Sequence, residues 1–159
     1  MAKSPRRLRP DDVLYRAMRP GEYDAQGPLP LAFEYTGTDR STGLPSATLS
    51  FSAHREATPA DALAAISRQG VARRLCGTGK RPPSPEAMYR HGFRVAALPA
   101  RWVLDARRLP SAGVRIAADA LGNEVEPNGH VQLHGGAGLA EVWARLSRTL
   151  SREETFPEP

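Results

Sequence analysis

The 159-residue chain contains one cysteine, Cys76, which excludes an internal disulfide and a cysteine-rich zinc site. It also lacks an apolar run near the roughly 20 residues that a membrane-spanning helix needs. The basic start, MAKSPRRLRPDD, is not followed by an apolar segment, so it does not have the pattern of a secretory signal. We therefore expect a cytoplasmic protein with a reduced thiol and no membrane partner.

Lysine is scarce: twenty of the 22 basic residues are arginine. The net charge is +5. Between residues 68 and 108 ten basic residues accompany only two acids, Glu86 and Asp105. A field of this sign attracts nucleic acid, nucleotides or an acidic protein. Codon bias in a GC-rich genome also enriches arginine, and a scattered arginine excess is equally compatible with a solvated surface.

The length fits one domain, and 40% hydrophobic with 25% charged residues is ordinary for a globular protein. We predict a flexible basic arm over 1–11, a single compact α+β domain over 12–152 and a frayed tail over 153–159. Strand-like segments outnumber helical ones and do not alternate regularly with them. This order favours a mostly antiparallel, strongly bent sheet over a doubly wound one.

Two segments are predicted to be the main helices. The first covers about 58–69, with Thr58 as the N-cap and Asp61 completing a capping box, and Gly70 is its expected stop. The second covers about 138–151, where apolar residues recur at helical spacing.

Alternation of apolar and polar residues predicts the strands. In ATLSFSA, residues 47–53, Leu49 and Phe51 point one way, and Ser50 and Ser52 point the other. Further strand-like segments lie at 31–35, 93–105 and 114–118, and 12–19 is either a strand or a short helix.

The stretch GNEVEPNGHVQLHGG, residues 122–136, combines a Pro-Asn-Gly turn signal with a short alternating run. If 130–134 is a strand, then His130, Gln132 and His134 line up on one face, and we take these three as candidate catalytic residues. The glycine pair that follows opens the last predicted helix, where backbone N–H groups can receive an anion.

This polar row permits more than one chemistry. Two histidines on one face can share a metal ion, but a site needs a third ligand and no H-E-x-x-H-like motif supplies it, so we predict no metal site. A histidine that titrates near neutral pH, with arginines to stabilise phosphate charge, is also a constellation that cleaves RNA.

Nicotinamide-dinucleotide chemistry is the third possibility, and it depends on three short pieces of the chain. LYRAM, residues 14–18, resembles the first core strand of ADP-ribosyltransferase-like proteins. LSFS, residues 49–52, resembles their polar second motif strand, and 130–134 takes the place of the third motif strand.

By this resemblance the cofactor is NAD. Arg16 then holds the dinucleotide phosphates or ribose, Tyr15 belongs to the same cofactor site, and Ser50 and Ser52 line the nicotinamide pocket. In the third motif a glutamine or a histidine stands where many members carry a catalytic glutamate, which puts their transferase activity in doubt here.

Two classes of function follow. We favour a small toxin-like or effector-like enzyme whose cationic cleft acts on an anionic substrate such as NAD or RNA. The alternative is a non-enzymatic interaction module that binds a protein or nucleic-acid partner through its basic 68–108 region and its C-terminal amphipathic helix. An enzyme gathers the candidate residues into one pocket, whereas a module leaves them apart.

Overall fold

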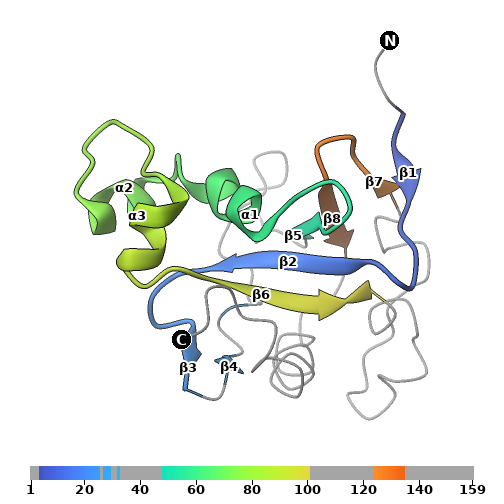
Figure 1. Ribbon diagram of the computed structural model, residues 1–159, viewed down its shortest axis with the longest axis horizontal. Helices are drawn as coiled ribbons and strands as arrows, with labels where there is room; N and C mark the ends of the chain where they lie inside the picture. The colour runs from blue at the N-terminus through green and yellow to red at the C-terminus, as the bar shows by residue number, and fades with distance from the viewer. Residues whose placement is uncertain (1–3, 26, 30–31, 33–47, 101–123, 135–159) are drawn as a thin grey trace.

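The computed structural model describes residues 4–25, 27–29, 32, 48–100 and 124–134 (Figure 1). Within them the chain forms antiparallel sheets and three helices, which confirms the α+β class. None of these helices is long and apolar enough to cross a membrane. The strands expected at 31–35 and 114–118, the helix at about 138–151 and the tail over 153–159 fall mostly or wholly outside the described residues.

The largest sheet has the strand order β6-β2-β5-β8, and every neighbouring pair is antiparallel. Its members are β2 (Val13–Met18), β5 (Thr48–Ala53), β6 (Arg94–Pro99) and β8 (His130–His134). The segment 12–19 is thus a strand. Pro99 ends β6 at one edge of this sheet as described, where a residue that cannot donate a backbone hydrogen bond is tolerated.

Two short ribbons accompany this sheet, β1 (Arg6–Arg7) with β7 (Glu124–Val125) and β3 (Tyr23–Asp24) with β4 (Gly27–Pro28). The first ribbon holds the chain's start, which we expected to be a flexible arm over 1–11. In this segment Arg6 and Arg7 pair with β7, and Leu8 is buried.

Helix α1 (Pro59–Ile66) begins as predicted. The side chain of Thr58 accepts a hydrogen bond from the Asp61 N–H, and the Asp61 carboxylate accepts one from the Thr58 N–H, which is a complete capping box. The helix ends earlier than expected, where the Ser67 hydroxyl donates to the carbonyl of Ala64.

Gly70 does not terminate the helical region; it begins α2 (Gly70–Cys76). Gln69 takes an extended conformation and serves as the N-cap, so a short break separates α1 from α2. Gly77 ends α2 in the left-handed conformation that favours glycine, with φ of +67°. The third helix, α3, spans Pro85–Arg90.

The three helices lie on one side of the four-stranded sheet, and α1 packs on its strands directly (Figure 1). Ala62 and Leu63 of α1 and Met88 of α3 are buried together with the sheet residue Val95. Tyr15 of β2 packs against this cluster, so the residues that share its face of the sheet belong to the helix-covered side. The opposite face is also buried, through Leu14, Met18, Phe51, Ala96, Leu98 and Val131.

Candidate functional site

The β7–β8 hairpin builds the site. Its three-residue loop, 127–129, closes with the Gly129 N–H donating to the Glu126 carbonyl at 2.8 Å and the Glu126 N–H donating to the His130 carbonyl at 3.0 Å. Gly129 completes the loop in the left-handed region, with φ of +90°. The Asn128 side chain accepts a hydrogen bond from the His130 N–H. Glu126 and His130 therefore lie opposite each other at the base of the hairpin.

Glu126, His130 and Ser50 form a continuous acid–base chain. His130 Nδ1 lies 3.1 Å from a carboxylate oxygen of Glu126, and Nε2 lies 3.3 Å from the hydroxyl of Ser50 on β5. The His130 side chain is 35% exposed and that of Glu126 is 55% exposed, so solvent reaches both. With the Nδ1 proton held by the carboxylate, Nε2 is left free to accept a proton.

The position of Ser50 suits proton transfer at His130 better than attack by the serine itself. Ser50 lies inside a strand, where backbone N–H groups point along the plane of the sheet and side chains stand perpendicular to it. N–H groups in that plane do not point at a group bound to the Ser50 hydroxyl. A backbone oxyanion hole of the kind that acyl transfer needs is therefore not built beside it.

The register places the remaining candidates around this chain. Ser52 lies directly opposite His130, and the backbones of Gln132 and His134 pair with those of Ser50 and Thr48. The side chains of Gln132 and His134 lie outside the described part of the molecule.

The structure separates the residues of the expected dinucleotide site. Tyr15 pairs with Ser52, and Ser52 lies opposite His130. Tyr15 therefore shares the helix-covered face with Ser50 and His130. Arg16 lies on the other face, with its guanidinium 5.8 Å from the centre of the Phe51 ring. It donates to the carbonyls of Ala32 and Ser50 at 2.6 and 3.0 Å. Arg16 therefore contacts the backbone of Ser50 from behind rather than joining the hydroxyl side of that residue.

Sequence reasoning did not single out Glu126. The signal for it is the five-residue segment E-P-N-G-H, in which a turn triplet separates an acid from a histidine. A three-residue hairpin loop brings the two flanking positions opposite each other, which is how this carboxylate reaches the imidazole.

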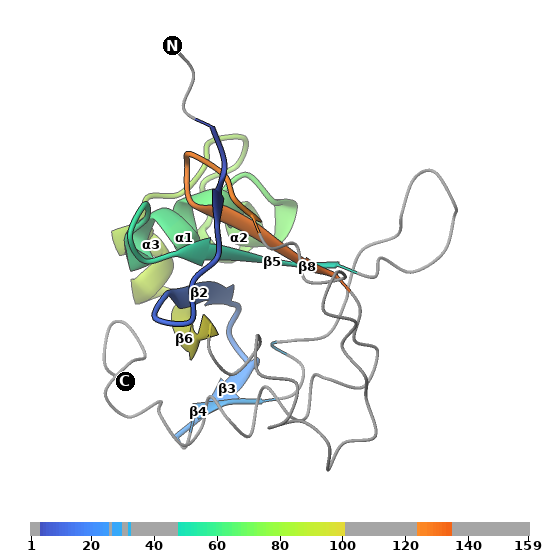
Figure 2. The same ribbon diagram turned by 90° about the vertical axis from the view of Figure 1, so that its right-hand side faces the viewer.

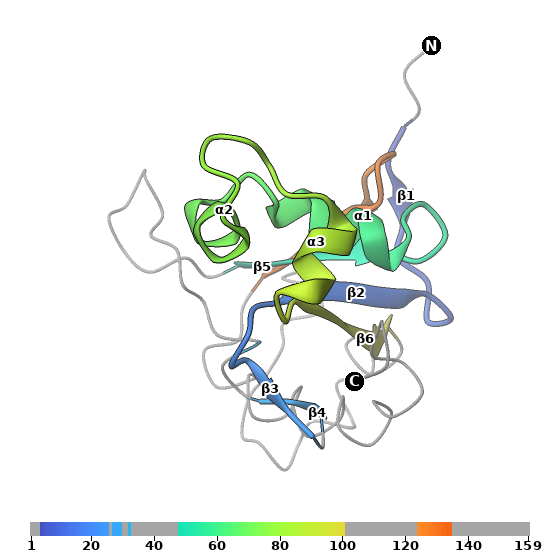
Figure 3. The same ribbon diagram turned by 60° about the vertical axis from the view of Figure 1, so that its left-hand side comes forward.

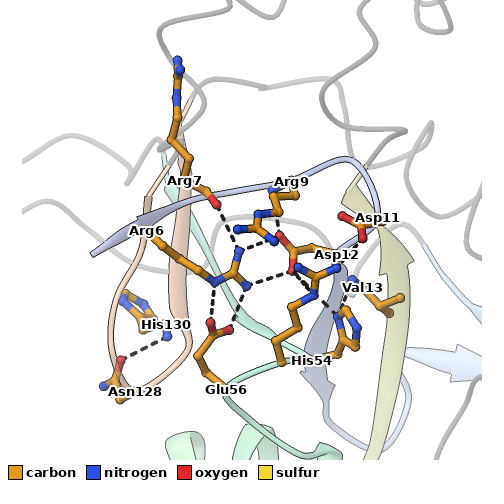
Figure 4. A network of polar contacts seen from close by, with 11 residues as sticks. Arg6, Arg7, Arg9, Asp11, Asp12, Val13, His54, Glu56, Asn128 and His130 are labelled. Atoms are coloured by element: carbon orange, nitrogen blue, oxygen red, sulfur yellow. Dashed lines mark hydrogen bonds and ion pairs between the residues drawn. The ribbon is translucent and has the colours of Figure 1, made fainter. Parts of the chain in front are cut away.

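An ionic cluster fixes the start of the chain beside the hairpin (Figure 4). Its core comprises Arg6, Asp12, Arg55 and Glu56, and we call it the N-terminal ion cluster. Arg6 donates to both oxygens of Asp12, at 2.8 and 2.9 Å, and to both oxygens of Glu56. Arg55 pairs with Asp11 and lies 3.6 Å from Asp12. Two chain segments far apart in the sequence are thereby held together.

The charges of this cluster are mutually stabilised. Burial acts against ionisation of Asp12, but hydrogen bonds from Arg6 and the Arg9 N–H and the charge of Arg55 outweigh it, so the pKa of Asp12 lies below its usual value. The hydrogen bond from Arg6 likewise lowers the pKa of Glu56, against a smaller effect of burial. The same partners raise the pKa of Arg6. Arg6, Asp12 and Glu56 are therefore charged at neutral pH.

The N-terminal ion cluster also touches the site. A Cβ placed at Gly129 would lie 3.1 Å from the Cβ atoms of both Glu56 and Ala57, so the hairpin loop packs directly on the segment that Arg6 holds. The β1–β7 ribbon adds a second attachment on the other side of the hairpin. Together they determine where Glu126 and His130 are presented.

No group of three His, Cys, Asp or Glu side chains that could hold a metal ion occurs among the described residues. Comparison with known proteins found no matching family model, no matching curated protein and no matching solved structure. Functional inference therefore depends on the site itself.

Proposed function

We propose that this chain is an enzyme that acts on an anionic phosphodiester substrate such as RNA, with His130 as the residue that moves the proton. The observation that carries the proposal is the acid–base chain of Glu126, His130 and Ser50. The net charge of +5 favours a substrate of the opposite sign.

The reaction proceeds without a protein nucleophile. His130 Nε2 takes the proton of a ribose 2′-hydroxyl, whose oxygen attacks the adjacent phosphorus while the bond from phosphorus to the 5′-oxygen breaks. The products are a 2′,3′-cyclic phosphate and a 5′-hydroxyl, which receives its proton from the imidazolium. Glu126 holds the imidazole in the reactive tautomer and stabilises its positive charge during the transfer. This route uses the parts of the site that are present and requires no backbone oxyanion hole at Ser50.

NAD is a second candidate substrate, which the resemblance to ADP-ribosyltransferase-like proteins suggests. The observation in its favour is that Tyr15, Ser50, Ser52 and His130 share one face of the sheet. The position of Arg16 on the other face does not favour it. RNA is therefore the substrate we place first.

The test is cleavage of a fluorogenic RNA by the full chain, with NAD consumption measured in parallel. Loss of a positioned acid–base residue removes a factor of about 10² to 10⁴ in rate, and we expect His130→Ala to show such a loss. His91→Ala is the matched control, because His91 is exposed at the end of α3. Cleavage that survives in His130→Ala contradicts the proposed role, and wild-type protein that turns over neither substrate favours the interaction module.

We further place this activity in the cytoplasm. The support is the single cysteine, Cys76, which forms no disulfide and suits a reducing compartment. Cell fractionation checks the assignment, and recovery of the protein outside the cytoplasm contradicts it.

A further inference from the structure

The outer surface of the helical layer carries unneutralised positive charge. Its exposed cations are Arg68, Arg74, Lys80, Arg81 and Arg90, and we call them the cationic helical surface. Glu86 is the single acid between residues 67 and 93. Within the described residues no ion pair joins any of the five cations to a carboxylate. Each is therefore free to bind an anion from solution.

A tight turn displays two of these cations. The Arg81 N–H donates to the Thr78 carbonyl at 3.1 Å, and the Thr78 hydroxyl donates to the Arg81 carbonyl at 2.6 Å. Gly77 and Gly79 both adopt left-handed φ angles, +67° and +65°, which only glycine takes without strain. Lys80 and Arg81 are thus held on a folded turn rather than on an extended loop.

One apolar side chain interrupts this charge. Leu75 on α2 is 43% exposed, and it is the exposed large hydrophobic residue of the described part of the chain. A single leucine is too little to insert into a bilayer, and an interface core with a protein partner is usually depleted in charge. Nucleic acid fits better, because its backbone needs cations and its bases accept apolar contact.

The cationic helical surface and the acid–base chain lie on the same side of the sheet. Figures 2 and 3 show α1, α2 and α3 on the same side of the sheet, where α1 packs on the strands and α2 packs on α3. The helix-covered face is also the face on which Ser50 and His130 meet, since Tyr15 packs under the helices and shares that face. A nucleic-acid strand bound to α2 therefore lies on the side of the sheet where the proposed chemistry occurs.

We propose that the cationic helical surface is the docking surface for the phosphate backbone of single-stranded RNA. The inference rests on the proposed function for its link to catalysis, but the binding itself requires no chemistry. The surface accounts for substrate capture, which the three residues of the acid–base chain do not provide. Its contacts are with phosphates, so sequence preference is weak and affinity depends strongly on salt.

Binding is measured by fluorescence anisotropy of a labelled 12-nucleotide RNA on full-length His130→Ala protein, over a salt series. Lys80→Ala with Arg81→Ala should weaken binding about tenfold and lower the salt slope by about 1.4, or 0.7 for each lost phosphate contact. Arg7→Ala with Arg9→Ala is the charge-matched control, because both arginines are exposed and belong to the segment of β1, which lies on the opposite side of the molecule from α2 (Figure 1). The control should leave the slope unchanged.

Equal losses in the two double variants would show that net charge alone attracts RNA and would overturn the proposal. Binding to vesicles of anionic lipid or to a poly-glutamate peptide, without binding to RNA, would overturn it as well. Because the measurement uses protein that lacks His130, RNA binding with the expected pattern supports this surface even if the wild type cleaves nothing. Absence of cleavage by the wild type contradicts only the proposed catalytic function.

Discussion

The guanidinium of Arg6 binds both carboxylate oxygens of Glu56, fifty residues further along the chain. Such a two-bond arrangement fixes direction as well as distance. Because Glu56 packs against the loop of the β7–β8 hairpin, the pair connects the start of the chain to the candidate site. The same guanidinium neutralises the buried carboxylate of Asp12.

Replacement of Arg6 should destabilise the protein. Arg6→Ala leaves the carboxylate of Asp12 buried without its main partner, and we expect the free energy of unfolding to fall by about 2 to 4 kcal/mol. Arg7→Ala is the control, because the neighbouring side chain is exposed and its loss should change stability by about 0.5 kcal/mol or less. Urea denaturation measures both. Equal losses in the two variants would contradict a structural role for the N-terminal ion cluster.

The ion cluster should also set the response to acid. The pKa values of Asp12 and Glu56 lie below their ordinary values of 3.8 and 4.5, so the unfolded chain binds protons more readily than the folded one. Their contribution to stability is present above about pH 4.5 and is lost as the pH falls through the lowered folded values. Denaturation from pH 7 to pH 3 should show this decline in the wild type and a shallower decline in Arg6→Ala. Parallel curves would contradict it.

Glu22 should change stability with pH in the direction opposite to Asp12 and Glu56. Burial raises the pKa of this carboxyl above its ordinary 4.5, despite the nearby charges of Arg16 and Arg19. The charged form is thus disfavoured in the folded state, and stability is lost as the pH rises through the raised value. Glu22→Gln should therefore stabilise the protein at pH 7, with a gain that disappears below about pH 4.5. A gain that is the same at both pH values would rule out titration of Glu22 as its cause.

Two glycines with the same φ angle allow the stability cost of backbone strain to be separated from the cost of crowding an added side chain. Gly21 and Gly129 both have φ of +90°, but a Cβ at 21 meets open space, whereas one at 129 lies 3.1 Å from two side-chain carbons. We expect Gly21→Ala to cost about 1 kcal/mol from the backbone alone and Gly129→Ala about 2 to 3 kcal/mol. Thermal or urea unfolding gives both values. Equal costs would mean that the hairpin loop does not pack closely on residues 56 and 57.

Glu126 should matter for activity and not for stability. Its side chain is 55% exposed, so Glu126→Gln should change the free energy of unfolding by about 0.5 kcal/mol or less. The amide no longer stabilises an imidazolium, and RNA cleavage should fall about tenfold or more. The comparison requires rate and stability on the same preparation. A variant that loses stability but keeps its rate would assign Glu126 a structural role.

Local patterns in the sequence predicted local structure well. The capping box of Thr58 and Asp61 placed the start of α1, because both partners lie within one helical turn. The alternation around Ser50 and Phe51 predicted a strand with one buried face, and Phe51 is buried. The Pro-Asn-Gly triplet predicted the turn before β8. In each case the deciding contacts lie within a few residues.

The site itself required information that periodicity does not contain. Ser50 and His130 meet eighty residues apart because β5 and β8 are neighbours in the sheet, and strand order is not written in either strand alone. Alternation along a strand puts Tyr15 and Arg16 on opposite faces, but only the register of β2 shows that Tyr15 is the one on the face of Ser50 and His130. The pairing of Arg6 and Arg7 with β7 likewise joins residues more than a hundred positions apart, which local composition does not show.

The strand order has a consequence for how the protein assembles during synthesis. β2 is the first strand of the large sheet to leave the ribosome, yet it lies between β5 and β6 and must wait for both. β8 joins later still, and β1 finds its partner only when residue 125 has emerged. Pairings that close such long loops are slow, because the chain loses entropy before the contacts form. Arg6 and Arg7 are therefore made before most of the sheet but are among the last residues to reach their native place.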